Sequence, residues 1–370
     1  MKKIIKFCKN CVVSNMRPRI YFNEFGICNA CENTKLKINI DWKKRKSEFL
    51  RLIKKHKKNN GDFDCIVPSS GGKDSAIVAH KLKYEYGMNP LTVTWSPLRY
   101  TDIGYENLIK FSESGFPIIF GKANGKILRK LTRKALIEMG DPFQPFIYGQ
   151  VNFPLKIAAK YKISLIFDGE NGEEEYGGNK EVKKKGFNTK DAINFWFSNY
   201  SVDYWRKKGF TKKELNIFSP PSIKEIKNSN IERHFWSYYF KWSPQNHFYY
   251  SACNTNFKPN YLRSEGTYSK YASLDDKFDG FHFYFAYLKF GIGRATSDAC
   301  QEIRNNQITR EEGVRLVKKY DGEFPKKYYN DFLEFCEISE KEFKKIIEKW
   351  RSRKVWSNIK GIWKLKAIVN

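Results

Sequence analysis

The chain has 370 residues, of which 41% are hydrophobic and 29% charged, and its 68 Lys and Arg against 40 Asp and Glu give a formal net charge of +28. This length suggests two or three structural units, and the hydrophobic fraction excludes a disordered chain. No apolar run approaches the length that spans a bilayer, and the first residues lack the features of a signal peptide, so we expect a cytoplasmic protein without a membrane span.

The positive charge has two interpretations. Clustered Lys and Arg side chains are the footprint of proteins that bind nucleic-acid phosphates. Here Lys outnumbers Arg and accompanies abundant Asn, Ile, Tyr and Phe, a mixture that an AT-rich genome gives to any of its proteins. The basic segment after Trp42 also alternates lysines with an apolar stripe, which is typical of the solvated face of a helix. We therefore expect that the chain does not bind nucleic acid. Nucleic-acid binding is kept as the alternative interpretation of the charge.

Two Cys-x-x-Cys pairs predict a zinc ribbon over residues 1–40. Cys8 and Cys11 form the first pair, and Cys28 and Cys31 form the second. Two such pairs at this separation match a tetrahedral four-thiolate zinc site, which has no open coordination position and is therefore structural. Disulfide bonds are the competing interpretation, but a cytoplasmic chain with eight cysteines, half of them in these pairs, favours the metal.

A basic helix from Trp42 to Lys58, within a linking segment at residues 41–61, leads to the main domain at residues 62–180. Short apolar runs in this domain alternate with helical patterns, which predicts a parallel α/β sheet. The expected strands are residues 65–67, 91–95, 117–120 and 163–167. Helices are expected after the first strand and around residues 107–111, 126–139 and 156–160, with a Pro- and Gly-punctuated loop at 141–149.

The turn after the first strand reads Ser70-Gly-Gly-Lys-Asp-Ser75. Adjacent glycines let the backbone approach a ligand closely, and the helix that follows begins with unpaired N–H groups, which bind anions and above all phosphates. The spacing fits neither the Walker P-loop nor the dinucleotide-binding fingerprint. It resembles the PP-loop of the ATP pyrophosphatases (adenine nucleotide alpha hydrolase-like proteins), which implies that the turn holds the β- and γ-phosphates of ATP and that ATP is cleaved between its α- and β-phosphates.

The strand at 163–167 runs into an acidic, glycine-rich loop, Asp168-Gly-Glu-Asn-Gly-Glu-Glu-Glu-Tyr-Gly-Gly178. Ligands of open α/β sheets gather at the carboxyl ends of strands, so this loop is expected beside the phosphate loop. Departure of pyrophosphate calls for magnesium, which takes only one or two carboxylates from a protein. The candidate magnesium ligands are Asp74, Glu170, Glu174 and Glu175, and the sequence does not choose among them.

Residues 181–275 are predicted to form an aromatic-rich insertion, and residues 276–370 a mainly helical C-terminal part that contacts phosphate. Most of the aromatic side chains are expected in the core, and some on a surface that stacks on a sugar or a base. The segment Lys289-Phe-Gly-Ile-Gly-Arg294 places two cations around glycines, an arrangement suited to polyphosphate. Asp74, Lys289 and Arg294 are therefore the candidate catalytic residues.

Together, these motifs resemble the N-acetyl sugar amidotransferase family over nearly the whole chain, and the later Glu302-Ile-Arg304 and Thr309-Arg-Glu-Glu312 extend the resemblance. Members of that family belong to the PP-loop superfamily and convert an acetamido group into an acetamidino group during the biosynthesis of bacterial surface polysaccharides, such as lipopolysaccharide O-antigen and capsule, or of flagellin sugars. The resemblance implies ATP, magnesium and an acetamido sugar or nucleotide sugar, with ammonia from a separate glutaminase subunit.

The expected reaction adenylylates the acetamido oxygen, releases pyrophosphate, and then lets ammonia displace AMP. ATP contacts are predicted for Ser70, Gly71, Gly72, Lys73, Asp74, Ser75, Gly169 and Glu170. Lys73 occupies the variable position of the motif, so we expect its side chain to point away and the loop amides to hold the phosphates. The alternative is a tRNA-modifying PP-loop enzyme, a thiolase or lysidine-type ligase, and a third reading is a non-enzymatic zinc-ribbon binding module.

Overall fold

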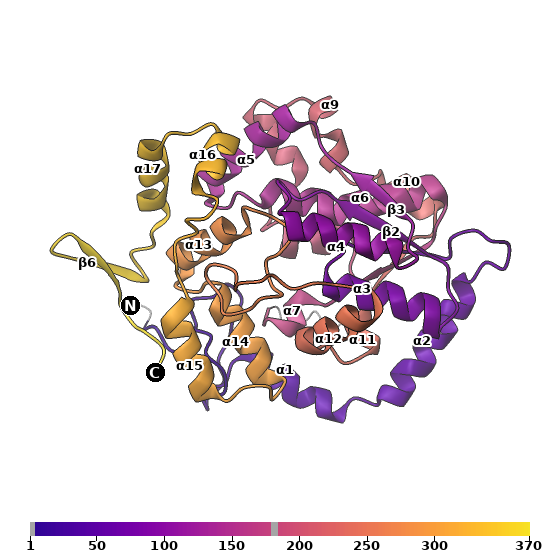
Figure 1. The fold of residues 1–370 in the computed structure, drawn as a ribbon, viewed down its shortest axis with the longest axis horizontal. Helices are drawn as coiled ribbons and strands as arrows, with labels where there is room; N and C mark the ends of the chain where they lie inside the picture. The colour runs from indigo at the N-terminus through magenta and orange to yellow at the C-terminus, as the bar shows by residue number, and fades with distance from the viewer. Residues whose placement is uncertain (1–3, 179–183) are drawn as a thin grey trace.

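A five-stranded parallel sheet forms the centre of the molecule in the computed structural model, which describes residues 4–178 and 184–370 (Figure 1). The strands are β1 (Cys65–Pro68), β2 (Pro90–Trp95), β3 (Ile118–Gly121), β4 (Leu165–Asp168) and β5 (Glu232–Phe235), in the spatial order β3-β2-β1-β4-β5. The parallel α/β sheet and its first four strands are confirmed. β5 was not predicted, and it lies beyond residue 180, where the sheet domain was expected to end.

Different helices cover the two faces of the sheet. Cys65 and Val67 of β1 pack with α2 (Trp42–His56) and α3 (Lys73–His80) on one face. Ile66 packs on the other face with α6 (Gln144–Tyr161). Because side chains alternate between two buried faces, β1 reads as the continuous apolar run from which it was predicted.

Helix α6 differs from its prediction. The expected loop at 141–149 is wrong, because α6 begins at Gln144 and continues to Tyr161. Pro145 lies in the first turn, where backbone N–H groups have no partner within the helix, so a residue without an N–H loses no hydrogen bond there. It therefore marks the start of the helix rather than a loop. The preceding helix α5 (Gly125–Met139) agrees with its prediction and ends at Gly140, whose φ is +59°.

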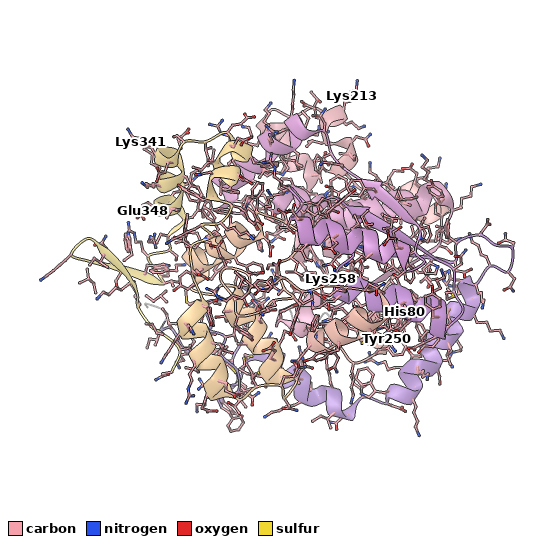
Figure 2. All side chains as sticks on the ribbon, in the orientation of Figure 1. His80, Lys213, Tyr250, Lys258, Lys341 and Glu348 are labelled. Atoms are coloured by element: carbon pink, nitrogen blue, oxygen red, sulfur yellow. The ribbon has the colours of Figure 1, made fainter. Side chains whose placement is uncertain are left out.

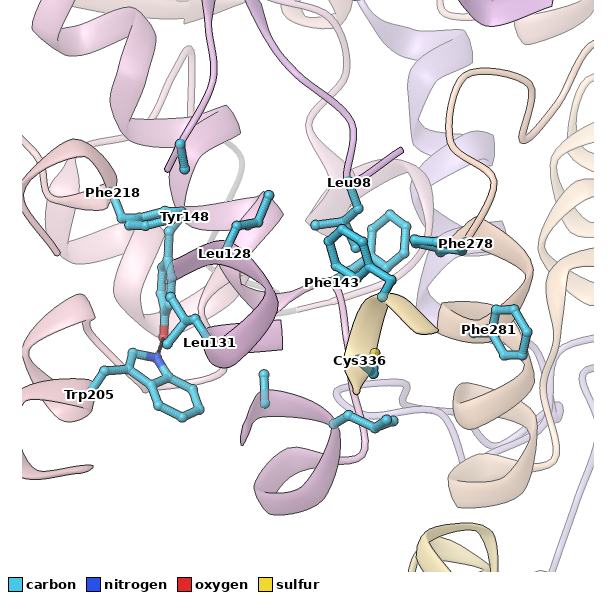
Figure 3. Packing of buried hydrophobic residues seen from close by; sticks show 14 of the residues in the cluster. Leu98, Leu128, Leu131, Phe143, Tyr148, Trp205, Phe218, Phe278, Phe281 and Cys336 are labelled. Atoms are coloured by element: carbon cyan, nitrogen blue, oxygen red, sulfur yellow. Dashed lines mark hydrogen bonds between the residues drawn. The ribbon is translucent and has the colours of Figure 1, made fainter. Parts of the chain in front are cut away.

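A second core joins α5 and α6 to later parts of the chain (Figure 3). Tyr148 of α6 is fully buried and accepts a hydrogen bond of 3.1 Å from the indole N–H of Trp205. Phe143 belongs to the same buried cluster as Phe278 and Phe281, which come from the C-terminal part of the chain. Aromatic side chains far apart in sequence therefore fix the C-terminal helices against α6.

The N-terminal segment folds around its cysteines and packs against the C-terminal helices α14 (Arg294–Arg304) and α15 (Arg310–Tyr320). Its backbone pairs in two isolated antiparallel bridges, Phe7 with Ser14 and Phe22 with Cys28, followed by α1 (Asn29–Leu36). The basic linking helix is confirmed as α2.

Helix α12 (Pro244–Asn254) packs on α3, and His80 Nδ1 lies 2.8 Å from the Tyr250 hydroxyl where the two labelled side chains meet in Figure 2. In the same view Lys213 and Lys341 extend from the outline of the molecule. The remaining helices are α4 (Asp102–Glu113), α7 (Gly172–Glu175), α8 (Thr189–Asp191), α9 (Lys212–Leu215), α10 (Ile223–Asn228), α11 (Trp236–Tyr239), α13 (Asp279–Phe290), α16 (Tyr329–Cys336) and α17 (Glu340–Trp350). Further turns are 3₁₀ at Lys37–Asn39, Val202–Lys208 and Asn216–Phe218, and π at Lys81–Glu85 and Ala192–Trp196.

The C-terminal part is mainly helical, as predicted, but it ends in a hairpin that was not predicted. Strands β6 (Trp356–Ile359) and β7 (Ile362–Leu365) pair with each other and project from the body of the molecule in Figure 1. Among the helices of residues 4–178 and 184–370, none combines the length and apolar character needed to cross a bilayer.

Candidate functional site

The two predicted ligand loops leave the sheet side by side. β1 and β4 are neighbours, and the sheet continues from β1 toward β2 and β3 but from β4 toward β5. Ile66 pairs with Ile166, so the loop after Pro68 and the loop after Asp168 emerge together at the carboxyl edge. A crevice opens where the strand order diverges in this way, and ligands of open α/β sheets bind there.

The phosphate loop is shaped by its own side chains and by one obligatory glycine. Ser69 Oγ accepts a hydrogen bond of 3.2 Å from the Gly71 N–H and lies 2.9 Å from Ser75 Oγ. Gly71 has a φ of +81°, and a Cβ there would lie 2.6 Å from the Leu108 Cα, so only glycine fits. Among the described residues, no side chain caps the first turn of α3, which leaves its N–H groups available to an anion.

Asp74 is fixed from two sides. Its Oδ2 lies 2.5 Å from Lys73 Nζ, and its Oδ1 lies 2.8 Å from Nδ1 of His247 on α12. Burial alone would raise the pKa of Asp74, but Lys73 and His247 together hold that pKa well below its ordinary value. The backbone N–H of Ser243 donates to His247 Nε2 over 3.4 Å, which places the ring proton on Nδ1, facing Asp74. The carboxylate is therefore ionised and oriented.

The side chain of Lys73 does not point away from the site, and that expectation is wrong. It is only 10% exposed and lines the same cavity as Asp74. Its Nζ lies 5.7 Å from the centre of the Tyr271 ring. Lys73 therefore places a positive charge in the cavity, next to the N–H groups that the loop offers to an anion.

The carboxylates of the acidic loop do not all face the cavity. Glu170 lines the cavity, and burial together with the Asp74 carboxylate raises the pKa of Glu170 to about 7. Glu175 is buried and forms an ion pair with Lys37 instead. Within the part of the chain that the structure describes, neither Glu174 nor Glu175 lines the cavity. Of the four candidate magnesium ligands, the structure therefore brings Asp74 and Glu170 together.

The rest of the acidic loop is held by the N-terminal segment and by α14. Arg19 donates two hydrogen bonds to Glu173, of 2.5 Å and 3.0 Å. From α14, Arg304 and Gln301 both donate to the backbone carbonyl of Glu175, over 2.8 Å and 3.2 Å. The position of Glu170 thus depends on contacts from both ends of the chain.

A cavity of about 540 Å³ extends from the phosphate loop to the C-terminal part, a size that suits a small molecule. Gly169, Glu170 and most of the loop from Ser70 to Ser75 line its floor. Phe187, Trp196 and Phe235 stack on one another along its wall, with ring centres 4.5 Å apart for Phe187 and Trp196 and 5.3 Å apart for Phe187 and Phe235. This wall is a flat apolar surface of the kind that a base or sugar ring covers.

The two cations of the C-terminal motif have different surroundings. Arg294 lines the cavity, and its Nε donates to Asp298 over 2.9 Å. Burial opposes the charge, but Asp298 and Asp279 raise the pKa of Arg294 above its ordinary value. Lys289 does not line the cavity among the described residues. Its Nζ donates to the Met139 carbonyl over 3.3 Å, and burial lowers its pKa.

Several polar residues of the site were not predicted. Asp275 at the end of the aromatic-rich insertion and Asp279 and His282 of α13 line the cavity, and His247 supports Asp74. No local pattern marks them, because His282 sits in an aromatic run and His247 is far from Asp74 in sequence. Only the folded chain brings these side chains to the phosphate loop.

The four predicted zinc ligands come together. The sulfur atoms of Cys8, Cys11, Cys28 and Cys31 lie within 4.8 Å of one another, and all four residues are buried. The Cys8–Cys31 and Cys11–Cys28 sulfur distances are 4.0 Å and 3.7 Å, far beyond a disulfide bond of about 2.0 Å. The Cys28 N–H lies 3.2 Å from Cys8 Sγ, and Arg304 Nη1 lies 4.0 Å from Cys11 Sγ, so donors already surround the thiolates. The cluster fits a structural zinc ion.

Replacing Cys11 with serine is expected to remove this metal and loosen the N-terminal segment, because folding and zinc binding are coupled in such sites. Elemental analysis of the purified chain should find one zinc ion per molecule, and the Cys11→Ser variant should have lost it. Cys253→Ser is the matched control, since Cys253 is exposed and lies outside the cluster. Iron in the unaltered chain, or no metal at all, would contradict the assignment.

Residues 265–369 match the family model described as "LPS biosynthesis protein WbpG-like, C-terminal domain". The C-terminal part is therefore similar to a lipopolysaccharide-biosynthesis domain. The chain is also 36% identical over 87 residues to the "Uncharacterized protein MJ1599" of Methanocaldococcus jannaschii. That similarity covers 23% of this chain and 31% of the relative, so the chain spans less than a third of the length of the relative that it matches. The WbpG-like segment contributes Tyr271, Asp275, Asp279, His282 and Arg294 to the cavity.

Proposed function

We propose that the chain is an ATP-dependent amidotransferase that converts an acetamido group of a sugar or nucleotide sugar into an acetamidino group, with AMP and pyrophosphate as products, in lipopolysaccharide or related surface-glycan biosynthesis. The main support for this proposal is the lining of one cavity. A single cavity is lined on one side by the phosphate loop with Asp74 and on the other by the WbpG-like segment. We take the loop as the binding site of the nucleotide, and the WbpG-like segment as the link to lipopolysaccharide biosynthesis.

The polar groups around the loop suit the polyphosphate of ATP. The first-turn N–H groups of α3 offer donors, and Lys73 and Arg294 offer two cations that line the cavity. Charge grows on pyrophosphate as the bond to the α-phosphate breaks, and donors that are already in place stabilise it without reorganising. Lys289 has no part in this arrangement, since its Nζ is bound to the Met139 carbonyl.

Asp74 and Glu170 are the two carboxylates that fit a magnesium ion here. Their mutual repulsion contributes to the raised pKa of Glu170, and a divalent cation bound by both would relieve it. His247 and Lys73 occupy one direction at each Asp74 oxygen, and each oxygen keeps a second lone pair. Magnesium would neutralise charge on the phosphates of ATP.

The chemistry follows from the poor leaving ability of an amide oxygen. The acetamido oxygen attacks the α-phosphorus of ATP, the bond to the β-phosphate breaks, and pyrophosphate leaves with the electron pair. Ammonia then adds to the former carbonyl carbon, and AMP departs with the oxygen. The cavity supports this sequence by holding both reactants in one place, which is worth several kcal/mol of orientation in general. Ammonia from a partner glutaminase is part of the proposal.

The experiment is an incubation of the purified chain with ATP, magnesium, ammonium and a panel of acetamido sugars and nucleotide sugars. AMP and pyrophosphate should form only with a suitable sugar, and the sugar product should be lighter by the difference between an oxygen atom and an NH group. ATP cleavage that ignores every acetamido sugar would contradict the proposal.

A further inference from the structure

Helix α13 presents two unlike faces. Phe281, Phe285 and Leu288 are fully buried in the second core. Asp279, His282 and Phe283 line the cavity instead. Asp279 and His282 are three residues apart, so one helical face carries both polar side chains into the cavity. His282 therefore brings a titratable side chain to a small-molecule cavity from a helix that is rich in aromatic residues.

His282 is held by an aspartate outside its own helix. Its Nδ1 lies 2.8 Å from Oδ1 of Asp141, in the loop between α5 and α6, and that oxygen also accepts the Phe143 N–H over 2.9 Å. Burial alone would raise the pKa of Asp141, but His282 and Lys289 hold the pKa of that carboxyl at about 2. An ionised carboxylate only accepts hydrogen bonds, so Nδ1 carries the proton and the lone pair of neutral His282 is on Nε2.

The other ring nitrogen is available. Among the described residues, none makes a hydrogen bond to Nε2 of His282, and the side chain is 30% exposed where the cavity opens beside it. The charged groups that face the ring are Asp141, Asp279 one turn earlier on α13, and Lys289 two turns later. This combination of a carboxylate on one nitrogen and a free lone pair on the other is the arrangement that orients a histidine for proton transfer.

We propose that His282 is the base that takes a proton from the attacking ammonia, with Asp141 as the residue that positions it. This inference rests on the proposed function and adds a catalytic residue to its second step. The first step needs the phosphate loop and its cations, whereas the second needs a proton acceptor, and His282 faces the same cavity from the WbpG-like segment.

The second step begins from an adenylylated imidate that is protonated on the sugar nitrogen. The lone pair of ammonia forms a C–N bond, and the electron pair of the C=N bond moves to the sugar nitrogen. The new nitrogen, now positively charged, gives one proton to Nε2 of His282. Its lone pair then forms the amidinium as the C–O bond breaks, and AMP leaves with that electron pair. His282 returns its proton to solvent.

His282→Gln separates the two steps. Sugar-dependent exchange of labelled pyrophosphate into ATP, measured without ammonium, reports the first step, and amidine formation reports the second. We expect the variant to keep the exchange and to lose amidine formation by on the order of 10²- to 10⁴-fold, the usual contribution of a general base. His80→Gln is the matched control, because His80 is the last residue of α3, at the end opposite the phosphate loop, where it bonds Tyr250 and does not line the cavity.

The pH profile supplies a readout that a structural role would not move. Burial opposes the charge of His282, but Asp141 raises its pKa above the ordinary value, so amidine formation should fall as pH drops through this raised pKa. Asp141→Asn removes the charge and should shift that fall to lower pH. Amidine formation by His282→Gln at the unaltered rate, an equal loss of both steps, or an unmoved profile in Asp141→Asn would overturn the inference. Absence of sugar-dependent exchange in the unaltered chain would instead contradict the proposed function.

Discussion

Replacing Asp74 with asparagine is expected to reduce sugar-dependent pyrophosphate release by about 10²-fold or more, the loss typical when one preorganised charged group is removed from an active site. The substitution keeps the shape of the side chain and leaves one oxygen for the 2.8 Å contact with His247. It removes the negative charge that pairs with Lys73 and that is proposed to bind magnesium. The fold should persist while the chemistry is lost.

The measurement is pyrophosphate release at saturating ATP, alongside thermal unfolding of each variant. Asp203→Asn is the matched control, because that carboxylate is 81% exposed and does not line the cavity. It should leave both the rate and the unfolding temperature unchanged. If Asp74→Asn released pyrophosphate as fast as the unaltered chain, the phosphate loop would not be the ATP site.

The second large effect is on stability, at the junction of β4 and β5. Arg233 donates to both oxygens of Asp168, over 2.5 Å and 2.7 Å, and to the Val151 carbonyl over 2.6 Å. Its side chain is 5% exposed and that of Asp168 is 16% exposed. Arg233→Met keeps much of the apolar stem but leaves a largely buried carboxylate unpaired, which is expected to cost about 3–5 kcal/mol of unfolding free energy.

Urea unfolding of Arg233→Met should be compared with that of Arg133→Met. Arg133 and Glu342 form an exposed pair at 3.5 Å, where water screens the attraction, so the control should unfold at nearly the same urea concentration as the unaltered chain. The double variant Arg233→Met with Asp168→Asn should recover part of the loss, because no charge then remains buried without a partner. Equal losses in the two single variants would mean that the Asp168 pair does not hold β5 to the sheet.

The elements that could be predicted from the sequence are those whose pattern lies within one short stretch of chain. The strand, glycine turn and helix around Ser70 to Ser75 occur within one stretch of chain, and the cysteine pairs have their own spacing. β5 was missed because Glu232-Arg-His-Phe235 has only a short alternating pattern, and its Arg233 is buried through a pair with Asp168 of β4. Nothing near Arg233 in the sequence indicates that partner.

The candidate site could be predicted only where its residues lie in short motifs, and not where distant residues meet. The sequence indicates that Asp74 and Glu170 belong at the carboxyl edge of the sheet, and the structure places both in one cavity. The contact of His247 with Asp74 and that of His282 with Asp141 join residues more than a hundred positions apart. Lys289 and Arg294 looked equivalent as a motif, but they belong to different helices. Lys289 lies in the last turn of α13 and bonds the Met139 carbonyl, whereas Arg294 begins α14 and lines the cavity.

The proposed adenylylation can be tested directly by following the acetamido oxygen. An acetamido sugar labelled in that atom with a heavy oxygen isotope should be incubated with the chain, ATP, magnesium and ammonium, and the products separated by mass. We expect the label to appear in the phosphate of AMP, in step with amidine formation, because the oxygen becomes bonded to the α-phosphorus before ammonia displaces it. AMP without label, or AMP formed only when tRNA is added and with no response to any acetamido sugar, would contradict it.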